Sequence, residues 1–343
     1  MHEDKTKKLQ VFPQERNTLI DRIFSIKTKA EFDLVCLDVF HYQVANNPVY
    51  SKWFNALSLD VNVIRHVEEI PFMPIEFFKS QRVISGNEDV EVTFTSSGTT
   101  GSVTSSHYIC DTDIYKQSYL EGFKLEYGNP SEWVIIGLLP AYLERPGSSL
   151  VYMTQGLIEA SGKPESGFFL NNLEELKEKL AQLAIRKQKV WLMGVSFALL
   201  DLAEMSPSAW SELVIVETGG MKGRRKELIR SELHQQIKQS WPIEHLHSEY
   251  GMTELLSQAW MKKDERFVCP PWMKIVIRDA SDPFQLLPEN KNGGIQIIDL
   301  ANIDSCSFIS TSDLGKKFED GSFEVLGRFD NSDIRGCNLL VDS

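Results

Sequence analysis

Hydroxyl and glycine residues crowd one stretch of the sequence, between Thr93 and Ser106. Glycines permit backbone angles that larger residues resist, and hydroxyls together with the N–H groups of a turn can wrap a polyanion such as a triphosphate. A polar surface loop is the alternative interpretation, and the stretch is not a Walker A loop because no Gly-Lys-Ser/Thr closes it. The candidate phosphate-binding residues are Thr95, Ser96, Ser97, Gly98, Thr99, Thr100 and Gly101.

Three later segments add carboxylates and a basic group. Residues 250–254 read Tyr-Gly-Met-Thr-Glu, and the carboxylate of Glu254 suits a hard cation such as Mg²⁺. Asp313 ends the run Phe-Ile-Ser-Thr-Ser-Asp, and its two carboxylate oxygens could accept hydrogen bonds from a pair of hydroxyls. Arg328 follows in Gly-Arg-Phe-Asp.

A glycine turn follows an apolar run at residues 213–217. It reads Glu-Thr-Gly-Gly over residues 217–220. Gly219 and Gly220 would let a flat base approach the backbone closely, and an ordinary turn at the end of a strand is the alternative.

The order and spacing of these motifs, from about Thr93 to the C-terminus, resemble the adenylate-forming superfamily of acyl-activating enzymes. Its members include acyl-CoA synthetases, luciferases and adenylation domains of peptide synthetases. The resemblance implies activation of a carboxylic acid, with ATP and Mg²⁺ as cofactors. It implies that the glycine loop holds the β- and γ-phosphates of ATP. Gly219, Gly220 and Tyr250 would lie near the adenine, with Gly251 in the same nucleotide site. The resemblance further implies that Thr253 bonds the α-phosphate, that Glu254 ligates Mg²⁺, and that Asp313 and Arg328 lie at the ribose.

The sequence departs from the superfamily in two places. The superfamily's loop usually carries a lysine a few residues on, but residues 102–107 contain none, and Lys222, Arg224 or Arg225 could replace its charge. A C-terminal domain with a catalytic lysine normally follows a hinge residue that Asp330 matches. The sequence ends at Ser343, so we expect that domain to be absent.

Cys337 lies in the C-terminal tail, between Gly336 and Asn338. Arg335 could favour its thiolate, which could attack an acyl-adenylate and form a thioester. A small buried core residue is the alternative for a free cysteine. With the glycine loop, the chain length and the absent lysine domain, this cysteine resembles that of the acyl-protein synthetases, the fatty acid–protein ligases of the fatty-acid reductase complex of luminous bacteria. Segments 138–145 and 267–274 also resemble that family.

That finer resemblance implies a fatty acid substrate, transfer of the acyl group to Cys337, and delivery to an acyl reductase subunit. It does not imply light emission. Two alternatives remain: a ligase that passes the adenylate to CoA or a carrier, and an inactive subunit that binds acyl groups or nucleotides. The sequence does not decide acyl chain length or oligomeric state, and a homo-oligomer is compatible with it.

Composition narrows the class of protein. The 343 residues are 42% hydrophobic and 24% charged, with a formal net charge of -12, which argues against nucleic acid or an anionic membrane as the main partner. The cysteines are odd in number and lack metal-binding spacing, so we expect neither disulfides nor zinc: Cys36, Cys110, Cys269, Cys306 and Cys337. The N-terminus lacks the apolar core of a signal peptide, and no apolar run approaches ~20 residues. We therefore expect a cytoplasmic protein without integral membrane segments.

Periodicity predicts the elements that position these residues. Helices are expected within 14–60 and over 111–127, 151–160, 173–188, 197–205 and 222–239. Strands are expected over 91–95, 133–139, 189–194, 213–217 and 243–246. This alternation predicts an α/β fold of mostly parallel sheets flanked by helices, like the N-terminal domain of adenylate-forming enzymes.

After residue 264 the pattern changes to short alternating runs at 274–278, 294–299 and 323–325. Gly293-Gly294 and Asp320-Gly321 are hairpin signals. We therefore predict a helical cap within the main domain (1–90), an α/β core that binds ATP and the acyl group (91–264), a β-rich subdomain (265–330) and a tail with the acceptor cysteine (331–343).

Overall fold

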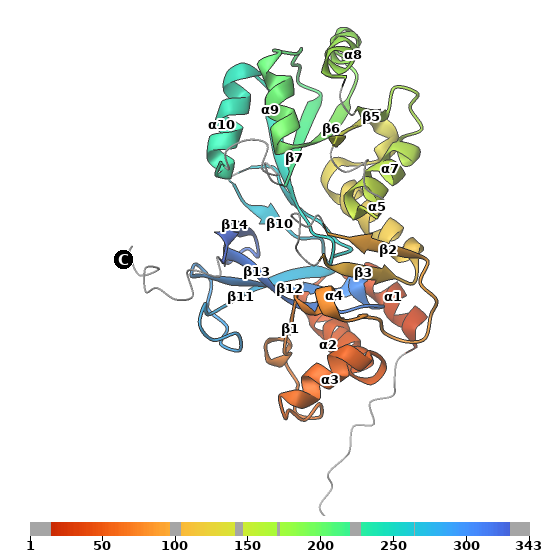
Figure 1. Ribbon diagram of the computed structural model, residues 1–343, viewed down its shortest axis with the longest axis vertical. Coiled ribbons are helices and arrows are strands. Elements are labelled where there is room, and N and C mark those ends of the chain that lie inside the picture. Colours follow the sequence, from red (N-terminus) through yellow and green to blue (C-terminus); the bar gives the residue numbers. More distant parts are fainter. Residues whose placement is uncertain are drawn as a thin grey trace, which may run out of the picture.

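The computed structural model describes residues 15–96, 104–140, 147–169, 172–219, 228–263 and 265–329. Within these residues, one sheet of 12 strands runs through both lobes of the molecule (Figure 1). Its strand order is β11-β12-β13-β14-β10-β9-β8-β7-β6-β4-β5, and β1 pairs with β13. A second, two-stranded sheet consists of β2 (Val92–Thr95) and β3 (Ser106–Ile109).

One half of the large sheet is parallel. Every residue of β4, β6 and β7 is buried, as expected for apolar strands covered on both faces. Helices α9 and α10 lie on one side of these strands, and α5 and α7 lie on the other (Figure 1). The parallel strands are β4 (Val134–Leu138), β5 (Gly167–Phe169), β6 (Val190–Val195), β7 (Leu213–Thr218) and β8 (His245–Tyr250). The helices are α5 (Thr112–Tyr127), η2 (Pro130–Glu132), α7 (Ser149–Ser161), α8 (Leu173–Ile185), α9 (Ser196–Glu204) and α10 (Arg230–Ser240).

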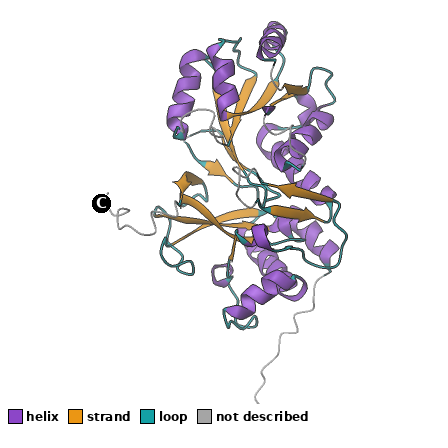
Figure 2. Cartoon of the chain, viewed as in Figure 1, coloured by secondary structure: helices purple, strands orange, loops and turns teal. Residues whose placement is uncertain are grey.

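The other half is antiparallel, and helices cover it (Figure 2). These helices come from the start of the chain (Figure 1). The rings of Phe40 and Tyr50 contact Phe308 at centroid distances of 6.1 and 5.9 Å. The antiparallel strands are β9 (Ala259–Met261), β10 (Phe267–Val268), β11 (Met273–Arg278), β12 (Asn292–Asp299), β13 (Phe308–Lys317) and β14 (Phe323–Arg328). The two-residue strand β1 (Met73–Pro74) pairs with β13 in parallel. The helices are α1 (Arg16–Phe24), α2 (Lys29–Asn46), α3 (Pro48–Ala56), η1 (Val67–Glu69), α4 (Phe77–Ser80) and η3 (Leu300–Asn302).

The predicted α/β fold is confirmed. The amphipathic segment at 173–188 forms α8, and the apolar runs at 189–194 and 213–217 form β6 and β7. Asp111 caps α5, because its side chain accepts a hydrogen bond from the N–H of Asp113. The four cysteines in the described residues are free thiols. No helix of the described part is long and apolar enough to cross a membrane. The proposed division into four segments stays a prediction.

The predicted hairpin at Gly293-Gly294 is wrong, because both glycines lie inside β12. A Cβ atom at Gly293 would lie 2.2 Å from the carbonyl oxygen of Arg278. Close approach of a neighbouring strand therefore explains this glycine, and no turn is needed. The signal at Asp320-Gly321 is confirmed: it joins β13 to β14, and Gly321 has a φ of 85°.

One strand near the motifs was not predicted, and one boundary differs from expectation. The unpredicted strand is β3, which pairs antiparallel with β2, so the glycine loop joins two strands. The strand predicted at 243–246 is β8, which runs through to Tyr250. The motif at 250–254 therefore begins on a strand and continues into a turn.

Candidate active site

Polar side chains gather where β6, β7 and β8 end. In open parallel sheets, ligands bind outside the carboxyl ends of the strands. Glu217 on β7 accepts hydrogen bonds from the hydroxyls of Ser196 (2.7 Å) and Ser248 (2.9 Å). His234 on α10 lies 3.1 Å from the Ser248 oxygen, and burial lowers the pKa of His234 to about 4. This neutral histidine donates to the Ser248 oxygen, and the Ser248 hydroxyl donates in turn to Glu217. Both oxygens of the Glu217 carboxylate are thus used in holding the ends of the strands.

Two of the predicted glycines directly follow these strand ends. Gly219 comes after β7 and has a φ of 29°, in the range that favours glycine. Gly251 comes after β8, and a Cβ atom there would lie 2.2 Å from the Oε1 atom of Glu249. Because glycine has no side chain, the backbone is uncovered at both positions. Gly220 lies outside the described residues.

Tyr250, Asp313 and Arg328 meet in the structure, although they come from three segments of the sequence. The Tyr250 hydroxyl donates to Oδ2 of Asp313 at 2.8 Å, and the Nε atom of Arg328 lies 3.2 Å from Oδ1. Asp313 and Arg328 are cross-strand partners on β13 and β14. Burial raises the pKa of the Asp313 carboxyl, and the hydrogen bond from Tyr250 opposes that rise. The sequence predicted the residues but not this contact.

The turn after β8 carries Thr253 and Glu254. Glu254 is 5% exposed, so its carboxyl group points into the protein. Burial raises its pKa, and a hydrogen bond from Ser105 at the start of the β3 segment opposes that effect. The hairpin base and the motif turn are therefore neighbours, as a shared phosphate site requires.

The base of the β2–β3 hairpin is closed by hydrogen bonds. The N–H of Ser96 donates to the carbonyl of Ser105 at 3.1 Å, and the N–H of Ser105 donates to the Ser96 hydroxyl oxygen at 2.9 Å. The N–H of Thr95 donates to the carbonyl of Gly147 at 2.8 Å. The backbone N–H groups of Thr95 and Ser96 are thus already used in closing the base of the hairpin.

Several predicted site residues lie outside the described residues, and their roles stay predictions. They are Ser97, Gly98, Thr99, Thr100, Gly101, Gly220 and Cys337, together with the basic candidates Lys222, Arg224 and Arg225.

Sequence reasoning missed two residues of this region. Burial raises the pKa of Glu249 to about 7, although the Thr218 hydroxyl donates to it at 2.6 Å. His107 on β3 is fully buried and reaches the carbonyl oxygen of Thr253. The alternation of Ser106-His107-Tyr108-Ile109 was the available signal for β3, but a buried histidine within a four-residue strand hides it.

The described residues fit a magnesium–nucleotide site in one respect. Among them, no group of three or more His, Cys, Asp or Glu side chains could hold a metal ion. Mg²⁺ is commonly bound through one or two carboxylates plus substrate phosphates and waters. The buried carboxylate of Glu254, next to Ser105 at the base of the β2–β3 hairpin, suits that pattern.

No protein-family model and no curated protein matches the sequence. Solved structures do match. ATP-bound MatB from Rhodopseudomonas palustris superposes with a TM-score of 0.53 at 17% identity, covering 71% of this chain and 49% of that one. The chain thus spans about half the length of MatB.

Two further structures extend the likeness. An open conformation of 2-hydroxyisobutyryl-CoA ligase, in complex with 2-HIB-AMP and CoA, superposes with a TM-score of 0.67 at 11% identity, covering 89% of this chain and 72% of that one. The luciferase-like enzyme of the mealworm Zophobas morio gives a TM-score of 0.52 at 16% identity, covering 81% and 64%. At these identities the likeness shows the fold: the chain is folded like the N-terminal domain of adenylate-forming enzymes.

Proposed function

We propose that the protein uses ATP to convert a fatty acid into an acyl-adenylate and then transfers the acyl group to its own Cys337. The observation that carries the first step is the contact of Asp313 with both Tyr250 and Arg328. It joins residues that the sequence assigned separately to one nucleotide site. The likeness of the fold to ATP-bound MatB supports the same assignment.

In the first step, a carboxylate oxygen of the acid attacks the α-phosphorus of ATP. A bond from that oxygen to phosphorus forms, the bond from phosphorus to the bridging oxygen breaks, and pyrophosphate leaves. Positioning and charge neutralisation supply most of the acceleration in such transfers. Thr253 would donate to the α-phosphate, and Asp313 would accept from the ribose hydroxyls.

Glu254 would hold Mg²⁺, which neutralises phosphate charge when bound. The carboxyl of Glu254 is almost fully buried beside Ser105, so it is fixed in place before substrate arrives. Tyr250 and Arg328 together fix the Asp313 carboxylate through both of its oxygens. These contacts keep the acceptor groups of the site in one arrangement.

In the second step, the thiolate of Cys337 attacks the acyl carbonyl carbon. A carbon–sulfur bond forms, the bond from carbon to the phosphate oxygen breaks, and AMP leaves with the electron pair. The resulting thioester would be delivered to an acyl reductase. The support for this step is the resemblance of the tail cysteine to that of acyl-protein synthetases.

A second candidate function keeps the first step and changes the acceptor to CoA. The observation that favours it is the superposition on 2-hydroxyisobutyryl-CoA ligase in complex with CoA. A third candidate, an inactive binding subunit, would retain nucleotide binding without chemistry.

The deciding experiment incubates the protein with labelled fatty acids of several chain lengths, ATP and Mg²⁺. We expect label on the protein that hydroxylamine removes and that maps to the Cys337 peptide. Cys337→Ser should lose this label and keep acid-dependent pyrophosphate exchange. Cys269→Ser, a half-buried cysteine elsewhere, is the matched control and should keep both.

Other outcomes point to the other candidates. Absence of protein label, with ATP consumption that begins when CoA is added, would support the CoA ligase. Absence of acid-dependent pyrophosphate exchange, with ATP binding retained, would support the inactive subunit.

A further inference from the structure

His107 lies directly behind the turn that carries Thr253 and Glu254. It comes from β3, and its side chain is fully buried. Its Nδ1 atom lies 2.9 Å from the carbonyl oxygen of Thr253, and its Nε2 atom lies 2.8 Å from the hydroxyl oxygen of Ser305. The ring also packs against Phe78, at a centroid distance of 5.5 Å.

These contacts define the protonation of the ring. A carbonyl oxygen can only accept, so the Nδ1 atom carries the proton and donates it to Thr253. Burial lowers the pKa of His107 to about 4, so the ring is neutral at neutral pH and Nε2 holds a lone pair. The Ser305 hydroxyl therefore donates to Nε2. The hydrogen bond at one ring nitrogen selects the tautomer that the other nitrogen uses.

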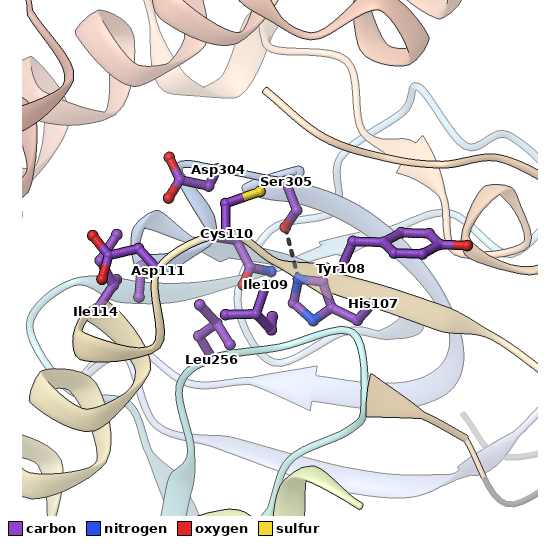
Figure 3. Close-up of a pocket in the computed structure, with 11 residues that line it drawn as sticks. His107, Tyr108, Ile109, Cys110, Asp111, Ile114, Leu256, Asp304 and Ser305 are labelled. Atoms are coloured by element: carbon purple, nitrogen blue, oxygen red, sulfur yellow. Dashed lines mark hydrogen bonds between the residues drawn. The ribbon is translucent and has the colours of Figure 1, made fainter. Parts of the chain in front are cut away.

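Ser305 is itself held by the N-terminal part of the chain. Its carbonyl oxygen accepts from the Nδ2 atom of Asn47 at 2.6 Å and from the hydroxyl of Ser85 at 2.8 Å. Figure 3 shows Ser305 above the His107 ring, with the hydrogen bond between them drawn. The cavity beside these residues has a volume of about 10 Å³, the space of about one water molecule. It is too small for a substrate, so the region supports the turn from behind.

Neighbouring groups of the turn are fixed in the same way. The Nδ2 atom of Asn302 donates to the carbonyl of Glu254 at 2.8 Å. Asp299 accepts from the N–H groups of Leu256 and Ser257, both at 2.9 Å. Successive carbonyls at Thr253 and Glu254 thus each receive a buried side-chain donor, and these donors set the direction of the intervening peptide groups.

We propose that His107 is a positioning residue: its Nδ1–H group fixes the Thr253 carbonyl and thereby aims the Thr253 hydroxyl and the Glu254 carboxylate at the reacting phosphate. Ser305 acts through His107 by donating to Nε2, a second hydrogen bond that holds the ring in place. This inference rests on the proposed adenylation and adds residues that do not touch the substrate. Displacement of such groups by about 1 Å can cost about 100-fold in rate.

Two substitutions separate the two ring nitrogens. In His107→Asn, the amide NH₂ takes the place of Nδ1–H and keeps the donor to Thr253. In His107→Gln, the longer amide reaches the place of Nε2 and keeps the partner of Ser305 but leaves Thr253 without its donor. Both variants remove the imidazole and leave one buried group unpaired, so each is the stability control for the other.

The measurement is kcat and KM for acid-dependent pyrophosphate exchange, with denaturant unfolding as a check on the fold. We expect His107→Asn to keep kcat within about threefold, and His107→Gln to lose about 30-fold or more, at similar unfolding midpoints and with similar KM for ATP. Ser305→Ala should fall between the two His107 variants, because the ring then keeps its hydrogen bond to Thr253 but loses the one that holds Nε2. Equal loss of kcat in both His107 variants, or full kcat in His107→Gln, would overturn the proposal.

Amide hydrogen exchange of the peptide covering residues 252–257 gives a readout that needs no activity. Exchange should be faster in His107→Gln than in His107→Asn, and equal exchange would count against the proposal. If the wild-type protein shows no pyrophosphate exchange with any acid, the proposed function fails. The hydrogen exchange comparison then decides by itself whether His107 holds the turn.

Discussion

The turn at Thr253 and Glu254 and the strand pair at Asp313 and Arg328 belong to the same candidate site, but they are fixed by different means. The turn is held by buried side chains, with Asp299 and Glu254 0% and 5% exposed. In the strand pair, the Arg328 side chain is 76% exposed, and the β-ladder itself sets the geometry.

This difference separates stability from activity. A buried polar group that loses its partner costs the protein its full desolvation penalty, whereas an exposed ion pair contributes little. Substitutions that leave a buried partner of the turn without its hydrogen bond should therefore change folding and activity together. Substitutions of Arg328, the exposed member of the strand pair, should change substrate binding and leave folding almost unchanged.

The largest expected effect is the loss of the Asp299 carboxylate. Asp299→Ala leaves the N–H groups of Leu256, Ser257 and Ala301 without their buried acceptor. We expect the free energy of unfolding to fall by about 3 to 5 kcal/mol, measured by urea titration. Asp89→Ala, at an exposed position, is the control and should stay within about 0.5 kcal/mol of wild type. A small change in Asp299→Ala would show that the turn is not held by this carboxylate.

Glu254 offers the next contrast, because its charge serves the reaction and not the fold. In Glu254→Gln, pyrophosphate exchange should fall about 10²- to 10³-fold. Stability should be unchanged or higher, since burial raises the pKa of Glu254 and so disfavours its ionised form in the folded protein. Glu174→Gln, on the exposed face of α8, is the matched control. Unchanged exchange in Glu254→Gln would remove this residue from the site.

Glu249, another carboxyl group of this region, should make the stability of the protein depend on pH. Burial raises its pKa from an ordinary value of 4.5 to about 7, so the folded protein binds this proton more tightly than the unfolded chain. Stability from this group is present below about pH 4.5 and is lost as pH rises through about 7. Glu249→Gln should therefore gain stability relative to wild type between pH 5 and 8, by about 2 to 3 kcal/mol. Parallel stability curves for the two proteins would contradict the raised pKa.

The smallest expected effect on stability is that of replacing Arg328, whose side chain is exposed. Arg328→Ala should leave the free energy of unfolding within about 0.5 kcal/mol of wild type, while the KM for ATP rises about fivefold, equivalent to about 1 kcal/mol. Arg328→Lys keeps the charge but not the planar guanidinium group, so its KM for ATP should lie between those of wild type and Arg328→Ala. A loss of stability as large as that of Asp299→Ala would end the distinction between the two regions.

Local patterns were sufficient to predict most of the parallel half of the sheet, although the three-residue strand β5 was not predicted. Strands β4, β6 and β7 are buried on both faces and therefore read as continuous apolar runs. Helix α8 is buried on one face and therefore shows a single stripe of leucines. The antiparallel half was harder. β13 mixes buried apolar residues with polar ones that face the candidate site, so its alternation is broken. Gly293 and Gly294 imitate a turn because close strand packing and a tight turn both need glycine.

The site was predictable as a set of residues and not as a set of contacts. The motifs named Tyr250 and Asp313, but the hydrogen bond between them spans 63 positions and depends on the strand order between β8 and β13. The contact of His107 with Thr253 spans 146 positions. No pattern within one segment records such partners, since they are set by topology.

The packing of the first helices on the last strands has a consequence for synthesis. The buried side chain of Gln43 donates to the carbonyl of Asn302, which lies 259 positions later in the chain. Until the ribosome has made that segment, α2 has no surface on which to bury its apolar side, so this lobe can assemble only near the end of translation. The parallel strands, whose neighbours are close in sequence, can pair earlier. Nascent chains halted before residue 300 should therefore be cut by protease within α2 and protected within β6 and β7.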